Sequence, residues 1–247
     1  MSTVEPTVLG HVCIDLGPLI RSHLVRRENR FRVRVYIEGS QAAAFLANSG
    51  RLNELMVKDR VAWLTPAGTS RRKTAYDLTL VEHPDSLVTL DSHLPNRLIA
   101  KALLNRAIPG LENFTSVQAE VPFGRSRLDF CVADDLGKRC WVEVKSVTLV
   151  ENGLARFPDA PTARGRRHLR ELCAAVEQGD RASVIFVVQR SDAAGFTPHD
   201  ATDPEFGAAL REAAGHGVEV RALSCSVTLN HVCLQREIPV LLDALGC

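Results

Sequence analysis

Hydrophobic and polar residues alternate in short runs over the first third of the chain. The clearest run spans residues 30–37, where every second residue is hydrophobic and the residues between them include Arg30, Arg32 and Arg34. A period of two predicts a strand with one buried face and one basic face. Similar runs at 61–64, 75–82 and 86–90 are separated by turn residues. We therefore expect a barrel of about five strands in residues 1–91.

After residue 92 the pattern predicts helices alternating with strands. Hydrophobic residues spaced three or four apart, together with capping and stop residues, predict helices at 94–107, 162–178 and 203–217. Strands are predicted at 114–121, 127–133, 139–147, 183–189, 218–223 and 227–234. This order predicts an α/β domain on a mixed sheet in residues 92–247, so the whole chain belongs to the α+β class.

Composition excludes several classes of protein. The 247 residues are 45% hydrophobic, which is typical of a folded chain, and the longest apolar run is 184–188, far too short to span a membrane. Residues 1–6 lack the pattern of a secretory signal, so we expect a cytoplasmic protein. The seven cysteines include no Cys-x-x-Cys pair, and we expect them to be reduced and mostly buried.

Basic residues are clustered although the net charge is only +1. Six arginines and one acid lie within residues 21–34, and five arginines and one acid lie within residues 156–170. Such clusters indicate a polyanionic partner, although solvated protein surface is an alternative. Arg164 and Arg167 follow two prolines at the start of a predicted helix, whose free amides favour a phosphate. His168 lies on the apolar stripe of that helix and is as easily a buried structural residue as a catalytic one.

Asp129, Glu143 and Lys145 form the strongest candidate for catalysis. Residues 143 and 145 project from the same face of a strand, and a hairpin through 134–138 brings Asp129 onto the neighbouring strand. Two carboxylates held together favour a divalent cation, so we expect a Mg²⁺ or Mn²⁺ site with Glu120 as a third acid. A surface ion pair between Glu143 and Lys145 is the alternative.

The arrangement resembles the PD-(D/E)XK nuclease superfamily, in which an acid on one strand and an acid-x-lysine on the next bind the metal. Leu128 precedes Asp129 where the motif has proline. The resemblance implies that Asp129, Glu143 and Lys145 are catalytic.

Longer stretches resemble the sugar fermentation stimulation protein A family, in order from residue 17 to about 223. They are residues 27–31 (Arg-Glu-Asn-Arg-Phe), 48–52 (Asn-Ser-Gly-Arg-Leu), 126–130 (Ser-Arg-Leu-Asp-Phe), 142–149 (Val-Glu-Val-Lys-Ser-Val-Thr-Leu), 157–162 (Phe-Pro-Asp-Ala-Pro-Thr), 186–190 (Phe-Val-Val-Gln-Arg), Arg164-Gly165 and His168-Leu169. The resemblance implies an N-terminal OB-fold domain, a nuclease-like domain, sequence-independent DNA binding and a regulatory role in sugar (maltose) metabolism. The chain departs from the family at 56–60, and at Ala100-Lys101, where the family often has an acid.

Two functional hypotheses follow. In the first, Arg30, Arg32, Arg34, Arg164 and Arg167 bind DNA and the acidic site hydrolyses phosphodiesters. In the second, the protein is an inactive DNA-binding regulator that uses the nuclease fold as a scaffold. A sugar-responsive module is a third interpretation, and the sequence leaves the preferred form of DNA and the oligomeric state open.

Overall fold

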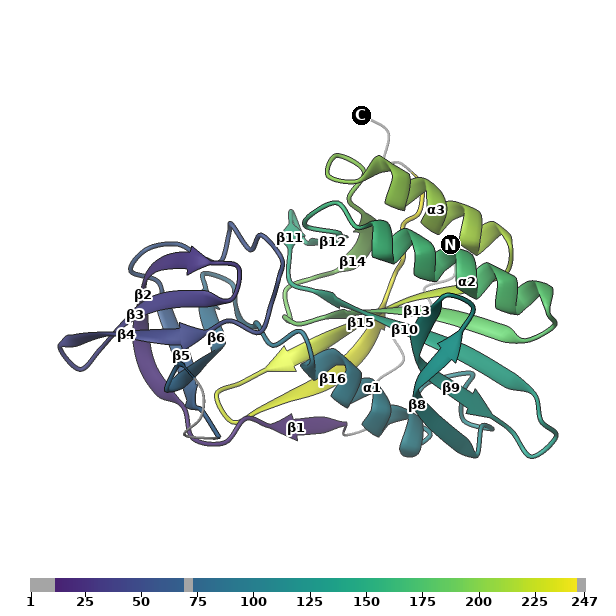
Figure 1. Cartoon of the computed structure of the whole chain (residues 1–247), viewed down its shortest axis with the longest axis horizontal. Helices are drawn as coiled ribbons and strands as arrows, with labels where there is room; N and C mark the ends of the chain where they lie inside the picture. Colours follow the sequence, from purple (N-terminus) through teal and green to yellow (C-terminus); the bar gives the residue numbers. More distant parts are fainter. Residues whose placement is uncertain (1–11, 69–72, 244–247) are drawn as a thin grey trace.

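A six-stranded sheet closes into a barrel near the start of the chain (Figure 1). The computed structural model describes residues 12–68 and 73–243, so the N-terminal residues 1–6 discussed above lie outside the described residues. The strands follow the order β4-β3-β2-β5-β6-β7, and β4 also pairs with β6, which closes a five-stranded barrel. They are β2 (Ile20–Asn29), β3 (Arg32–Ile37), β4 (Ser40–Phe45), β5 (Val61–Pro66), β6 (Tyr76–His83) and β7 (Ser86–Thr89). The predicted barrel is confirmed.

Alternation along β3 buries its hydrophobic side chains inside the barrel. Val33 and Val35 are fully buried, and Ile37 is nearly so. The predicted strand nevertheless began too early, because Arg30 and Phe31 form the turn between β2 and β3. The Asn29 side chain accepts the Phe31 N–H at 2.9 Å and stabilises this turn, which leaves Phe31 44% exposed.

A seven-stranded mixed sheet forms the second region, with the order β1-β16-β15-β13-β10-β9-β8. Figure 1 shows α2 and α3 side by side on one face of this sheet, and α1 packs against the other face. The elements are β1 (Cys13–Asp15), α1 (Leu94–Leu104), β8 (Ser116–Phe123), β9 (Ser126–Ala133), β10 (Arg139–Val147), α2 (Ala163–Glu177), β13 (Arg181–Val188), α3 (Pro204–Gly215), β15 (Glu219–Val227) and β16 (His231–Ile238). The α/β layering matches the prediction.

A small sheet of β11 (Val150–Glu151), β12 (Leu154–Phe157) and β14 (Gly195–Pro198) was not predicted. Its strands have only two to four residues, too few for a hydrophobic period to be recognised. No helix in the described part of the chain is long and apolar enough to cross a membrane.

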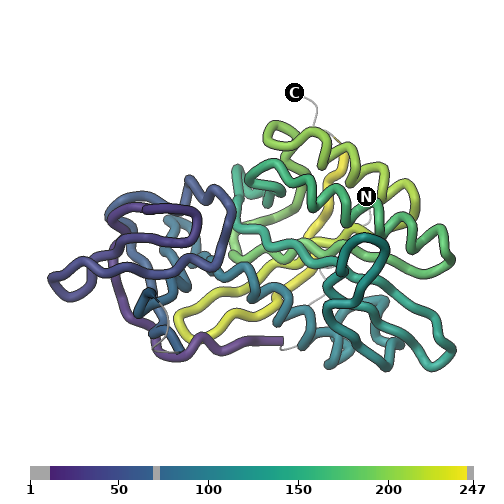
Figure 2. The backbone as a smooth tube through the Cα atoms, viewed as in Figure 1, coloured from purple at the N-terminus to yellow at the C-terminus, as the bar shows by residue number. Residues whose placement is uncertain are grey.

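The first strand precedes the barrel in sequence but belongs to the second sheet. Figure 2 shows the chain running beside β16 before it enters the barrel, and β1 pairs antiparallel with β16. This pairing sets Cys13 opposite Cys233, and the two form a disulfide. The expectation that all cysteines are reduced was wrong for this pair. The two residues are 220 positions apart, so no local spacing in the sequence indicates that they meet. Cys131, Cys140 and Cys225 are free and buried as expected, and Cys247 lies outside the described residues.

Side-chain hydrogen bonds hold the N-terminus of helix α2 in place. Thr162 is its N-cap, and its hydroxyl accepts the Gly165 N–H at 3.0 Å. Asp203 caps α3 in the same way, and its Oδ2 also accepts the Thr162 N–H at 2.7 Å. Because one carboxylate holds the first turns of both helices, the residues at the start of α2 have a defined position above the sheet.

A loop of the barrel is held against the second region. Arg27 donates to the carbonyl oxygens of Gly50 and Arg51 at 2.7 and 2.6 Å, which orders the loop after β4. Asp159 then accepts the Leu52 N–H at 3.4 Å across the junction. A buried arginine, Arg190, adds a second contact from the end of β13 to His83 of β6, at 3.1 Å. The barrel is therefore fixed next to the strand ends where β10 and β13 finish.

Candidate active site

Glu143 and Lys145 lie side by side on β10, as strand alternation requires. Lys145 Nζ donates to Glu143 Oε1 at 2.5 Å, and the Glu143 side chain is only 3% exposed. The same oxygen contacts Nδ1 of His168 from α2. The other carboxylate oxygen, Oε2, is buried and has no hydrogen-bond partner within residues 12–68 and 73–243. A buried carboxylate oxygen without a donor is costly unless something else binds it.

Asp129 lies on β9 where that strand separates from β10. The last paired residues of the two strands are Phe130 and Val142. Beyond them, Asp129 Oδ2 accepts the Val144 N–H at 2.8 Å, and Oδ1 accepts Nδ2 of Asn96 from α1 at 2.7 Å. The acid therefore lies in the fork between two strands, held by one strand and one helix.

The two carboxylates have opposite protonation tendencies. Burial, reinforced by the nearby negative charge of Glu143, raises the pKa of Asp129 to about 6. Burial alone would also raise the pKa of Glu143, but Lys145 and His168 outweigh it, and the pKa of Glu143 is lowered. Glu143 is thus charged at neutral pH, and its negative charge disfavours the ionised form of Asp129.

The geometry suits a divalent cation. Carboxylate oxygens are the ligands that Mg²⁺ and Mn²⁺ prefer, and the free Oε2 of Glu143 provides one next to Asp129. A cation there would relieve both the unpaired oxygen and the repulsion between the two acids. Glu143 and Asp129 are the residues that would hold it.

Glu120 does not join this cluster. It lies on β8, where its φ of 56° interrupts the pairing with β9 between Ala119 and Val121. Its carboxylate pairs instead with Arg127 at 2.5 Å, and its side chain is 54% exposed. The sequence suggested a third acid because Glu120 precedes Asp129 by one hairpin, but this irregularity sends its side chain to Arg127.

A basic cavity opens beside His168. It has a volume of about 250 Å³ and is lined by Ser126, Arg127, Arg164, Arg167 and His168. Arg164 Nε donates to His168 Nε2 at 3.3 Å, and Arg167 Nε donates to Ser126 Oγ at 3.1 Å. Within the described ranges, neither Arg164 nor Arg167 pairs with a carboxylate. Their charges are available to an anion.

The barrel arginines are less available. Arg32 Nε and Arg34 Nη2 both pair with Glu28, at 2.9 and 2.7 Å. Arg30 lies in the turn, with its guanidinium over the Phe31 ring at 5.4 Å. The sequence placed all three on one strand face, whereas one acid from β2 partly neutralises two of them.

Sequence reasoning missed Asn96 and underrated His168. Asn96 is a polar residue in an amphipathic helix, and nothing in the sequence links it to β9. His168 is 2% exposed, as its place on the apolar stripe suggested, yet it contacts Glu143 directly.

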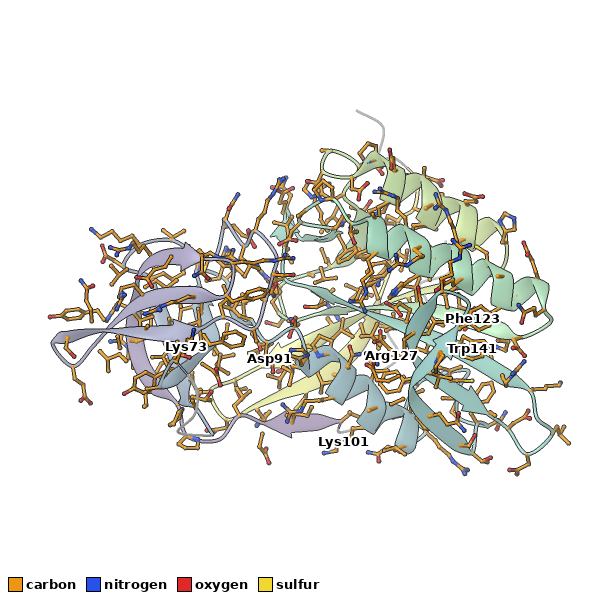
Figure 3. The ribbon with its side chains drawn as sticks, in the orientation of Figure 1. Lys73, Asp91, Lys101, Phe123, Arg127 and Trp141 are labelled. Carbon is orange, nitrogen blue, oxygen red and sulfur yellow. A yellow bond between two sulfur atoms is a disulfide. The ribbon has the colours of Figure 1, made fainter. Side chains whose placement is uncertain are left out.

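Lys101, labelled in Figure 3, donates to the Cys13 carbonyl oxygen at 2.8 Å and so contributes to holding β1.

A second group of potential ligands lies at the junction of the two regions. His83, Asp85 and Asp192 have ligand atoms within 4.8 Å of one another. However, Arg190 pairs with Asp192 through two contacts of 2.7 and 2.6 Å and also contacts His83. Its guanidinium already supplies the positive charge there, so we assign this group to holding the regions together.

Comparison with family models divides the chain at the same place as the fold. Residues 25–90 match the SfsA N-terminal OB domain, and residues 93–231 match the sugar fermentation stimulation protein RE domain. The chain belongs to the sugar fermentation stimulation protein family. Its predicted membership and its fold, an OB barrel followed by a nuclease-like domain, are confirmed.

Relatives match over almost their full length. A sugar fermentation stimulation protein homolog of Moorella thermoacetica is 47% identical over 85% of this chain and 90% of the relative. The homolog of Desulforamulus reducens is 44% identical over 94% of this chain and 96% of the relative. The solved structure of Pyrococcus furiosus SfsA in complex with Ca²⁺ has a TM-score of 0.86 and 32% identity, covering 92% of this chain and 98% of that one.

Proposed function

We propose that this protein binds DNA and hydrolyses phosphodiester bonds with a divalent metal ion held by Asp129 and Glu143. The observation that carries the proposal is the buried, unpartnered Oε2 of Glu143, in a fork of the sheet that also holds Asp129 and Lys145. A buried acceptor of this kind needs a partner, and a bound cation can supply it. The Ca²⁺ complex of the Pyrococcus furiosus relative is consistent with a hard divalent cation in this family.

Each residue has a role in this proposal. A bound Mg²⁺ or Mn²⁺ ion would activate a water molecule and neutralise charge on the phosphoryl group. Lys145, whose Nζ lies beside the proposed metal ligand Glu143, would stabilise negative charge that builds up on the phosphate in the transition state. Asn96 and the Val144 N–H hold the Asp129 carboxylate in the fork.

DNA binding rests mainly on Arg164 and Arg167, which have no acidic partner within the described residues. Arg164 and Arg167 line a cavity next to Glu143's partner His168, so a phosphate bound there would lie close to the acidic site. Phosphate contacts carry no sequence information, so we expect largely sequence-independent binding, to which Arg30, Arg32 and Arg34 of the barrel contribute. We place the protein in the cytoplasm, where DNA is accessible to it.

Cleavage can be tested directly. Circular single-stranded and double-stranded DNA are incubated with Mg²⁺, Mn²⁺ or EDTA, using wild-type protein and Glu143→Gln. We expect cleavage of at least one form by the wild type with metal, and none with EDTA or the variant. Cleavage that Glu143→Gln retains, or none by the wild type, would contradict the proposal.

A second candidate is an inactive DNA-binding regulator with a nuclease scaffold. It is favoured by Asp129, whose two oxygens both accept protein hydrogen bonds. The family's name connects it with sugar fermentation, and we extend this to a regulatory role in sugar (maltose) metabolism. A gene deletion complemented by wild type or Glu143→Gln tests it. Equal growth on maltose with either protein would support the scaffold, whereas failure of the variant would support catalysis.

A further inference from the structure

A chain of three side chains connects the basic cavity to the acidic site. Arg164 lines the cavity and donates from Nε to His168 Nε2 at 3.3 Å. The opposite ring nitrogen of His168, Nδ1, contacts Oε1 of Glu143. One buried imidazole therefore contacts both the arginine proposed to bind phosphate and the carboxylate proposed to bind metal.

The direction of these bonds defines the tautomer of His168. A guanidinium has only donors, so Nε2 must be the acceptor in its bond with Arg164. The ring proton then lies on Nδ1, which donates to Glu143. Lys145 donates to the same oxygen, so both donors hold Oε1 and leave Oε2 free. Histidine is suited to this position because its two nitrogens act on opposite sides of one rigid ring.

We propose that His168 is a positioning residue that orients Glu143 toward the metal and Arg164 toward a DNA phosphate. This inference rests on the proposed function and assigns a role to a residue that touches neither ligand. Partners of this kind are often worth 10- to 100-fold in metal affinity. Burial of His168 at 2% exposure, between α2 and β10, prevents the ring from moving away from either partner.

Two conservative variants separate the two halves of this role. His168→Asn places an amide near the position of Nδ1, so the variant keeps the donor to Glu143 and loses the acceptor for Arg164. His168→Gln places an amide near the position of Nε2, so the variant keeps the acceptor and loses the donor. His168→Leu removes both. His216→Asn is the matched control, because His216 is exposed at the C-terminal end of α3 and its ring contacts the Glu212 carbonyl oxygen of the same helix.

Metal binding is measured by calorimetry with Mn²⁺ on the full chain, without DNA. We expect His168→Asn to remain close to wild type, and His168→Gln and His168→Leu to lose roughly 10- to 100-fold in affinity. DNA binding is measured in EDTA as a function of salt. There we expect His168→Gln to remain close to wild type, and His168→Asn and His168→Leu to bind more weakly with a shallower salt dependence.

The split between Asn and Gln distinguishes positioning from a purely structural role. Equal losses in both variants, accompanied by lower melting temperatures, would overturn the inference, as would unchanged binding in all three. Wild-type protein that binds no Mn²⁺ would overturn the proposed metal site and the Glu143 half of the inference. The DNA measurement in EDTA would then still decide the Arg164 half.

Discussion

The carboxylate of Asp129 takes the place of a backbone acceptor for Val144. Its Oδ2 accepts the Val144 N–H at 2.8 Å, just beyond the last backbone pair of β9 and β10. The strand fork is thus stabilised by the same side chain that we propose as a metal ligand. Because this acid is buried near a second one, its protonation affects the stability of the fold.

The first prediction concerns pH. The pKa of Asp129 is about 6, raised first by burial and then by Glu143, whereas an aspartate in the unfolded chain titrates near about 3.9. The folded protein holds this proton more tightly, so this group's contribution to stability is present below pH 4 and is lost as the pH rises through 6. The loss is on the order of 1–3 kcal/mol.

Asp129→Asn should remove this contribution. Urea unfolding of wild type and variant in EDTA at pH 4.5, 5.5 and 7.5 measures it. The variant loses one hydrogen bond, so the informative quantity is the change with pH rather than the absolute stability. Parallel stability curves for the two proteins would show that Asp129 titrates normally.

The second prediction concerns metal-dependent stability. A cation that binds only the folded chain should raise the melting temperature. At a concentration 100 times its dissociation constant, it adds about 2.7 kcal/mol to the free energy of unfolding. We expect weak binding, with Mn²⁺ at least as effective as Mg²⁺. Glu143→Gln and Asp129→Asn should each abolish the rise, as followed by thermal unfolding, while DNA binding persists. An equal rise in both variants would place the cation elsewhere.

Lys145→Ala separates metal binding from chemistry. Lys145 donates to Glu143 Oε1, so it does not occupy the oxygen that we assign to the metal. We expect the variant to keep the metal-dependent rise in melting temperature and to lose DNA cleavage, as measured on circular DNA. Retained cleavage would remove Lys145 from the mechanism.

The fourth prediction compares the two groups of arginines. Arg164 and Arg167 have no acidic partner among the described residues, whereas Arg32 and Arg34 share Glu28. Arg164→Gln with Arg167→Gln should therefore reduce DNA affinity and the salt slope more than Arg32→Gln with Arg34→Gln, by up to about 1 in slope for each lost phosphate contact. Fluorescence anisotropy at several salt concentrations checks this. A larger loss from the barrel pair would move the main DNA contact to the barrel.

The fifth prediction concerns the junction of the two regions. A Cβ at Gly50 would lie 2.2 Å from Oδ2 and 2.9 Å from Cγ of Asp159. Gly50→Ala should therefore destabilise the protein by roughly 1–3 kcal/mol, as measured by urea unfolding. Combining it with Asp159→Ala should recover part of that loss, because the clash is removed. Additive losses in the double variant would show that the clash is relieved elsewhere.

Much of the fold followed from local pattern. Hydrophobic period, helix caps and turn residues predicted a barrel, all three helices and most strands of the second sheet, including β10 at 139–147, whereas β1, β2 and β4 were not predicted as separate strands. Alternation also predicted that Glu143 and Lys145 share a face, because residues two apart on a strand always do. These features depend on neighbours in the sequence, so the sequence alone determined them.

Only the tertiary structure decided the long-range relationships. The pairing of β1 with β16, the approach of His168 and Asn96 to the two acids, and the diversion of Glu120 to Arg127 all join segments far apart in the chain or depend on one irregular backbone angle. Hydrophobic periodicity reports which face of an element is buried, not which partner covers it. The residues that form the acidic site were therefore visible in the sequence, whereas the side chains that hold and orient them emerged only when distant elements packed together.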